Sequence, residues 1–289
     1  MSHRSGVSCF QGTRPGGNAV APATPRRSAA FTLVELLVVI SVISILASMV
    51  APAVGFARAT ARSRRCAGNL RHLGAAWQLY ADDFGGWCMP QVWFSARPYI
   101  YWWGAYSDPP DYSQGFLYTY LVGQSTGMGA PHVDDAFDCP EQPWGSYVPQ
   151  GVGRNPTTTY GYNGLYFCPF HSGWDFSVVG ANTRWRTLDM VEAPGEVFVF
   201  ADTLLDFGTY HKNNCLLDGP QKPAGKGAWT TNRYPTLCFR HVRQAVVCFA
   251  DGHAEGLPEG KATITSANLR IGYVGESNAP HYVPDWVSW

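Results

Sequence analysis

The strongest pattern in the chain is an apolar run near its start. From Phe31 to Val54 the sequence FTLVELLVVISVISILASMVAPAV is apolar except for Glu35 and a few Ser and Thr residues, and Arg27 and Arg58 flank it. A helix of this length spans about 36 Å at ~1.5 Å per residue, which is enough to cross the hydrocarbon core of a bilayer. The pattern predicts a membrane-spanning helix.

Helical spacing continues beyond this run. Leu70, Leu73 and Trp77 recur at intervals of three and four residues, and the glycine pair at 85–86 is a typical helix stop. We therefore predict a helix that extends to about Asp83, and we expect its apolar stripe to pack on a C-terminal head.

The C-terminal third has the pattern of an antiparallel sheet. GEVFVFAD at 195–202 reads as a buried strand. QAVVCFA, Asp251-Gly252 and HAEGL predict a hairpin with a two-residue turn. Residues 87–195 are rich in Gly, Pro and aromatic residues, which indicates loops and short strands. The predicted fold class is α+β, with a long N-terminal helix and an antiparallel β-sheet head.

The amino-acid composition argues against two classes of protein, nucleic-acid binders and zinc ribbons. Lys plus Arg and Asp plus Glu both number 21, so the net charge is zero and a nucleic-acid partner is not expected. The eight cysteines include no CxxC pair, which argues against a zinc ribbon. Cys248 falls within a predicted strand and is expected to be a free buried thiol. Disulfides would form only if the head leaves the cytoplasm.

Two ordinary explanations of the apolar run leave Glu35 unexplained. The basic pair at 26–27 and APA at 51–53 support a secretory signal peptide. However, the run is longer than the apolar region of a normal signal peptide, and it has an acidic residue, Glu35, near its start. A plain membrane anchor would place a carboxylate in the bilayer at a cost of about 2–3 kcal/mol.

The sequence RRSAA followed by FTLVELLVVISVISILASMVAPAV resembles the type IV prepilin signature. The resemblance implies cleavage between Ala30 and Phe31, with Ala30 where the family usually has Gly. It also implies N-methylation of Phe31 and a helix kink at Pro52. Glu35, the fifth mature residue, would pair with the Phe31 amine of a neighbouring subunit and set the register of assembly.

Further segments resemble a pilin-like family. These are RRCAGNLRHLGAAWQLYADDFGGW after the anchor, FDCP, TYGYN, and the spacing of His241 to Asp251 and Gly252, which matches a His-X9-Asp-Gly region. The resemblance implies a leader at 1–30, a transmembrane helix at 31–54, a helical stalk at 55–86 and a globular head at 87–289.

The function implied is a structural pilin-like or pseudopilin subunit of a type IV pilus or a type II secretion-like system, and not an enzyme. The implied partners are a prepilin peptidase, other pilin or pseudopilin subunits and the bacterial inner membrane, with the head in the periplasm or on the cell surface. The alternative is a membrane-tethered carbohydrate-binding or hydrolytic head exported through a pilin-type signal. Exposure of Trp93, Tyr101, Trp102 and Trp103 would favour the alternative, whereas burial would favour the pilin interpretation.

Catalytic chemistry has one candidate cluster, formed by His241, Asp251, His253 and Asp202. A strand between His241 and Asp251 would hold them about 30 Å apart, so they could not share a metal. We expect Asp251 to lie in a turn and His241 to be a capping or core residue.

A calcium site is the weaker metal hypothesis. HVDDAFD offers Asp134, Asp135 and Asp138, but their spacing is not that of an EF-hand, so a solvated acidic loop is expected instead. The sequence therefore predicts no cofactor, with calcium as the alternative.

Overall fold

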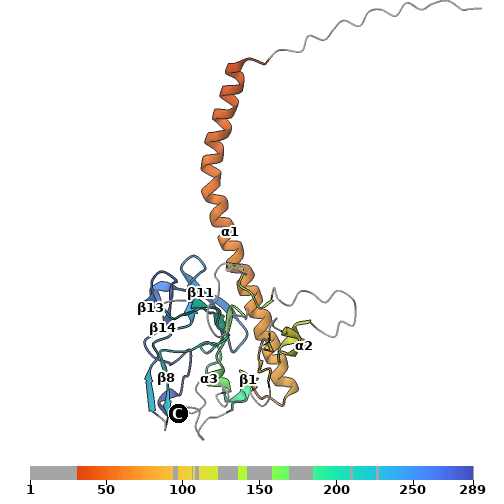
Figure 1. Cartoon of the computed structure of the whole chain (residues 1–289), viewed down its shortest axis with the longest axis vertical. Helices are drawn as coiled ribbons and strands as arrows, with labels where there is room; N and C mark the ends of the chain where they lie inside the picture. Colours follow the sequence, from red (N-terminus) through yellow and green to blue (C-terminus); the bar gives the residue numbers. More distant parts are fainter. Residues whose placement is uncertain are drawn as a thin grey trace, which may run out of the picture. The chain divides into compact units, whose positions relative to one another are not determined.

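The computed structural model describes residues 31–93, 97–105, 107, 111–122, 136–141, 158–168, 185–208, 211–225 and 228–288. The chain divides into two compact units, Met1–Ala51 and Pro52–Trp289. The boundary lies inside the first helix, α1, which runs from Leu33 to Asp83 (Figure 1).

The first unit consists, in its described part, of the N-terminal portion of α1. Every side chain from 31 to 51 is exposed, and most are apolar. The few hydroxyl groups bond within the helix: Ser41 Oγ donates to the Leu37 carbonyl and Ser44 Oγ to the Ile40 carbonyl, both at 2.7 Å. By length and composition this helix could cross a membrane, as the sequence predicts.

The second unit begins with the remainder of α1, whose apolar stripe is buried. Leu70, Leu73 and Trp77 are fully buried, so the predicted packing on the head is confirmed. The helix ends at Asp83, and the next glycines have left-handed φ values of 66° at Gly85 and 88° at Gly86. Gly86 N–H donates to the Ala81 carbonyl at 2.7 Å and so closes the helix end.

The central sheet has four antiparallel strands in the order β12-β11-β5-β4. The strands are β4 (Tyr160–Tyr162), β5 (Phe198–Asp202), β11 (Gln244–Phe249) and β12 (Ala254–Pro258). Every residue of β5 is buried, which confirms a buried strand within the predicted range 195–202, although the strand begins at Phe198. The α+β class with an antiparallel sheet is therefore confirmed.

Smaller elements surround this sheet. A second sheet has the order β10-β14-β13, a third has the order β1-β2-β3, and β6-β7 and β8-β9 are two-stranded. Their bounds are β1 Val92–Trp93, β2 Ile100–Tyr101, β3 Gly104–Ala105, β6 Leu205–Asp206, β7 His211–Lys212, β8 Gln221–Gly225, β9 Ala228–Thr231, β10 Leu237–Cys238, β13 Ala262–Ser266 and β14 Ile271–Val274. The short helices are η1 Tyr112–Gln114, α2 Tyr118–Val122, α3 Gly164–Phe167, η4 Leu188–Met190, η5 Glu259–Lys261 and η6 Trp286–Ser288.

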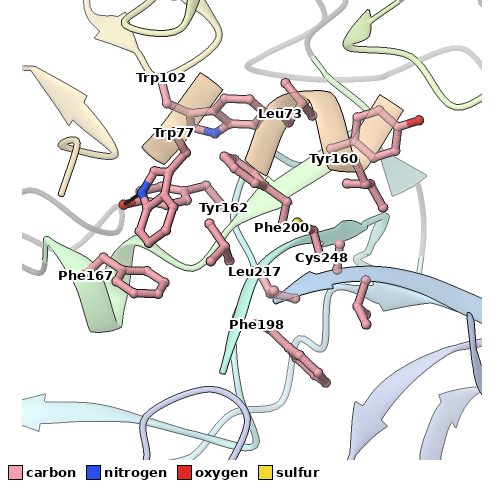
Figure 2. Packing of buried hydrophobic residues seen from close by; sticks show 14 of the residues in the cluster. Leu73, Trp77, Trp102, Tyr160, Tyr162, Phe167, Phe198, Phe200, Leu217 and Cys248 are labelled. Atoms are coloured by element: carbon pink, nitrogen blue, oxygen red, sulfur yellow. Dashed lines mark hydrogen bonds between the residues drawn. The ribbon is translucent and has the colours of Figure 1, made fainter. Parts of the chain in front are cut away.

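Aromatic rings fill the space between α1 and the central sheet (Figure 2). Trp77 of α1 donates its indole N–H to the Tyr162 hydroxyl at 3.2 Å. Trp102 and Trp103 are fully buried and Tyr101 is 4% exposed, whereas Trp93 is 46% exposed. Three of the four rings that could have formed an exposed platform are thus part of the core.

The predicted hairpin is present, but its turn is longer than expected. Phe249 N–H donates to the His253 carbonyl at 2.9 Å, which leaves a three-residue loop at 250–252 rather than a two-residue turn at Asp251-Gly252. Gly252 has a φ of 91°, so it takes the left-handed position that ends three-residue hairpin loops.

Gly74 sets the distance between α1 and the sheet. A Cβ atom at this position would lie 2.6 Å from the Cys248 Sγ of β11, which is well inside van der Waals contact. Gln78 Nε2 donates to the Ala250 carbonyl at 3.1 Å one turn further along the helix. The absence of a side chain at Gly74 therefore permits the close approach.

We predict that Gly74→Ala lowers the free energy of unfolding of the second unit by about 1–3 kcal/mol, because the core would be overpacked. In a Cys248→Ala background the same change should be neutral or stabilising by up to about 1 kcal/mol, since the clash is gone and Ala favours helix. Urea unfolding of the detergent-solubilised chain measures both.

Gly68→Ala is the matched control, because Gly68 lies on the same helix as Gly74 and a Cβ atom there would have no neighbour within 4 Å. It should stabilise. A Gly74→Ala protein as stable as Gly68→Ala would show that α1 does not approach β11 this closely.

Candidate functional site

The start of α1 is a capping box. Thr32 N–H and Thr32 Oγ1 donate to Glu35 Oε2 at 2.9 and 2.7 Å, while Glu35 N–H donates to Thr32 Oγ1 at 3.2 Å. Each side chain thus satisfies a backbone donor that the first turn of a helix leaves unpaired. The T-x-x-E signal of this box is visible in TLVE, but sequence reasoning assigned Glu35 to assembly alone.

The capping box holds the carboxylate at the N-terminal end of a helix with an apolar surface. Phe31, directly before the box, is 72% exposed, and Leu33, Val34 and Leu36 are each more than half exposed. These side chains have no buried surface within the described part of the first unit. The segment can therefore offer apolar surface and one negative charge to lipid or to other chains.

Two features predicted for this segment, the cleavage site after Ala30 and the kink at Pro52, stay predictions. Ala30 and the rest of the leader lie outside the described residues. Pro52 lies within α1, and its role as a kink stays a prediction.

A second group of chemical side chains lies inside the head. Cys66, Cys139, Asp202 and His241 are all buried, and one ligand atom from each lies within 4.8 Å of the other three. His241 Nε2 is 3.1 Å from Asp202 Oδ2 and 3.1 Å from Cys139 Sγ, and Cys66 Sγ is 3.3 Å from Asp202 Oδ2.

Four separate segments bring these residues together. Cys66 is on α1, Asp202 ends β5, and Cys139 belongs to FDCP (137–140), within the described segment 136–141. Arg62 of α1 holds that segment, because its Nη2 donates to Glu141 Oε1 at 3.2 Å.

His241 is placed by a tight turn before β11. His241 and Gln244 exchange two backbone hydrogen bonds of 3.0 and 2.9 Å, and the two residues between them have positive φ values, 49° at Val242 and 65° at Arg243. This is unfavourable for a β-branched residue such as Val242. The backbone is therefore strained at Val242 and Arg243, directly after the buried His241.

Electrostatics couples the members of this group. Burial alone would lower the pKa of His241, but the charge and hydrogen bonds of Asp202 and Cys139 raise this pKa to about 10. Burial would raise the pKa of Asp202, but the charge and hydrogen bond of His241 outweigh it and lower this pKa. Burial likewise opposes ionisation of Cys139, yet hydrogen bonds from Cys66 and His241 lower its pKa to about 7.

The four residues proposed from sequence as a cluster separate into two pairs. His241 contacts Asp202 in the core, while His253 Nδ1 lies 2.6 Å from Asp251 Oδ1 on the surface. The six residues of β11 lie between His241 and Asp251 and span about 20 Å. The expected separation of this pair is thus present, although over a shorter strand than the sequence indicated. Sequence reasoning missed Cys66 and Cys139, because no short spacing marks them.

The calcium hypothesis is only partly within the described residues. Asp134 and Asp135 lie outside them. The backbone carbonyl of Asp138 accepts hydrogen bonds from Asn69 Nδ2 at 3.2 Å and from the Tyr160 hydroxyl at 3.4 Å. Calcium binding here stays a prediction that these contacts do not decide.

The cysteines of the second unit are buried side chains. The seven cysteines from Cys66 to Cys248 are all buried, and six of them form no disulfide: Cys66, Cys88, Cys139, Cys215, Cys238 and Cys248. Cys248 is therefore the free buried thiol that the strand pattern predicts.

Comparison with protein families finds one match. A family model described as the prokaryotic N-terminal methylation motif matches residues 25–51. The match supports a type IV prepilin-like family, and with it a pilin-type substrate of prepilin peptidase. The resemblance of the His241, Asp251 and Gly252 region is not part of this match. Comparisons with curated proteins and with solved structures give no significant match.

The motif and the apolar helix together are consistent with a single-pass membrane-anchored protein. They point to a structural pilin-type subunit.

Proposed function

We propose that this protein is a pilin-like or pseudopilin subunit of a type IV pilus or a type II secretion-like apparatus. One observation carries the proposal: the methylation motif matches residues 25–51, and the described part of that segment is the exposed, apolar start of α1. Such a helix can be stored in a membrane and then packed against identical helices without refolding the head.

Processing prepares the helix for assembly. Prepilin peptidase on the inner membrane removes residues 1–30 by cutting between Ala30 and Phe31, and the new amine of Phe31 is methylated. The head then faces the periplasm, or the cell surface after assembly. The match to the methylation motif at 25–51 supports this site.

Glu35 sets the axial register between subunits. The capping box fixes its carboxylate beside the first turn of α1, where a neighbour's Phe31 amine can approach. A charge in an apolar environment is costly alone but favourable when paired and hydrogen-bonded. Subunits out of register would bury both charges unpaired, so the pair selects one offset.

The exported carbohydrate-binding head has less support. Its platform required four exposed rings, and three of them are buried.

The first prediction concerns the mature N-terminus. We expect chains purified from membranes to begin at Phe31 with a methylated amine, as read by mass spectrometry of the N-terminal peptide. A chain that keeps its leader, or that begins near Ala53, would contradict the proposal and indicate another kind of signal.

The second prediction separates the charge of Glu35 from its role as a helix cap. Glu35→Ala should still insert into membranes, because the segment becomes more apolar, but it should lose filament assembly. Removing one member of a buried pair costs about 3–5 kcal/mol at each subunit junction. Glu35→Gln can still cap the helix and accept a hydrogen bond from the amine, so it should assemble to an intermediate extent.

Thr32→Val is the matched control, because it removes the hydroxyl of the capping box and keeps the carboxylate. It should assemble nearly as well as the parent. Sheared-filament yield and membrane fractionation measure all three variants. Normal assembly of Glu35→Ala, or loss in Thr32→Val with full assembly of Glu35→Gln, would show that the charge is not the register.

A further inference from the structure

The buried group of Cys66, Cys139, Asp202 and His241 has the composition of a metal site. It offers two sulfurs, one imidazole nitrogen and one carboxylate oxygen, and each comes from a different segment of the second unit. We propose that these four residues bind a structural zinc ion.

The distances fit tetrahedral coordination. Zinc bonds of about 2.0–2.3 Å place tetrahedral ligand atoms about 3.3–3.8 Å apart. The separations here are 3.1 Å for His241 to Asp202, 3.1 Å for Cys139 to His241 and 3.3 Å for Cys66 to Asp202. Each of these three separations needs to widen by only a few tenths of an ångström, and the other three are at most 4.8 Å.

The chemistry of the ligands selects zinc over the hard cations. Thiolate and imidazole are preferred by zinc, whereas calcium and magnesium require several oxygen ligands. Four protein ligands complete a tetrahedral shell, and the side chains of Asp202 and His241 are 0% exposed. A site without an open position or access to water is a structural site rather than a catalytic one.

The surroundings also favour a cation. Asp202 Oδ1 is buried and has no hydrogen-bond partner among the described residues. When zinc binds, both thiols and the imidazolium release their protons, and two thiolates, one carboxylate and Zn²⁺ sum to one negative charge. Arg240 carries the compensating positive charge within electrostatic range of Cys139 and Asp202.

Outer contacts would orient the ligands. The Tyr160 hydroxyl lies 3.5 Å from Cys66 Sγ, and Val246 N–H donates to Asp202 Oδ2 at 3.3 Å. Such partners hold ligands in position and raise metal affinity.

A zinc ion here would fasten the helix to the head. Cys66 is on α1, and the other three ligands belong to the segment before β4, to β5 and to the turn before β11. Because these residues are distant in sequence, the ion would cross-link the unit without a disulfide and would stabilise it by its binding free energy.

The test uses the full chain, purified in detergent under reducing conditions without chelator. Elemental analysis should find about one zinc per chain. After removal of zinc, Co²⁺ alone should produce a thiolate-to-cobalt charge-transfer band, and Zn²⁺ should abolish it. A chain that holds no zinc and gives no cobalt band would overturn the proposal. A Cys66–Cys139 disulfide, found by mass mapping of alkylated peptides from a chain purified without reductant, would do the same.

Variants locate the ion. Cys66→Ser and Cys139→Ser should lower zinc affinity by at least about 100-fold, because even outer partners of ligands are worth about 10–100-fold. Cys248→Ala is the matched control, since this buried thiol lies outside the group, and it should keep one zinc. If either serine variant does not fold, the parent's zinc content and cobalt spectrum still decide the question. Full zinc content in a folded Cys66→Ser chain would place the ion elsewhere and refute the site.

Discussion

The apolar side chains of residues 33–51 are exposed along the whole first unit, and their removal from water is the constraint on which the function depends. Each large apolar side chain that leaves water contributes about 1.5–3 kcal/mol. Within the described part of the first unit nothing covers these side chains, and a bilayer or other copies of the helix would take them out of water. The stripe further along α1 is already covered, because Leu73 and Trp77 are buried in the head. The same helix therefore has exposed apolar side chains in the first unit and buried apolar side chains in the second.

In the proposed assembly, Glu35 makes this apolar surface specific. Apolar contact alone has no preferred offset, since neighbouring helices could slide with little change in buried area. A single carboxylate, held by Thr32 at the start of the helix, introduces a large penalty for every offset at which it lacks a cation. Glu35 also caps its own helix, so a carboxylate at this position would serve both the helix cap and the pairing with a neighbouring subunit.

Local signals predicted the long helix, its end and three of the four central strands, β5, β11 and β12. The spacing of Leu70, Leu73 and Trp77, the glycines at 85–86 and the run at 195–202 each depend on neighbours in sequence. The three-residue loop at 250–252 was less predictable, because an Asp-Gly pair is compatible with more than one hairpin geometry.

The buried group in the head could not be predicted in the same way. Cys66 lies on α1 and Cys139 lies 73 residues further along the chain, and the two meet only in the folded second unit. The turn that positions His241 has positive φ at Val242 and Arg243, and neither residue type signals such a turn. Tertiary packing, not local preference, determines these contacts.

The most direct test is to find the contact between subunits that Glu35 should make. Assembled material from a mixture of ¹⁴N- and ¹⁵N-labelled chains would be treated with a membrane-permeable carbodiimide, which joins an amine to a carboxylate without a spacer. If the pair sets the register, mass spectrometry should find the Phe31 amine linked to Glu35 in peptides that contain one light and one heavy chain. Links confined to single chains, or none in fully assembled material, would contradict that role.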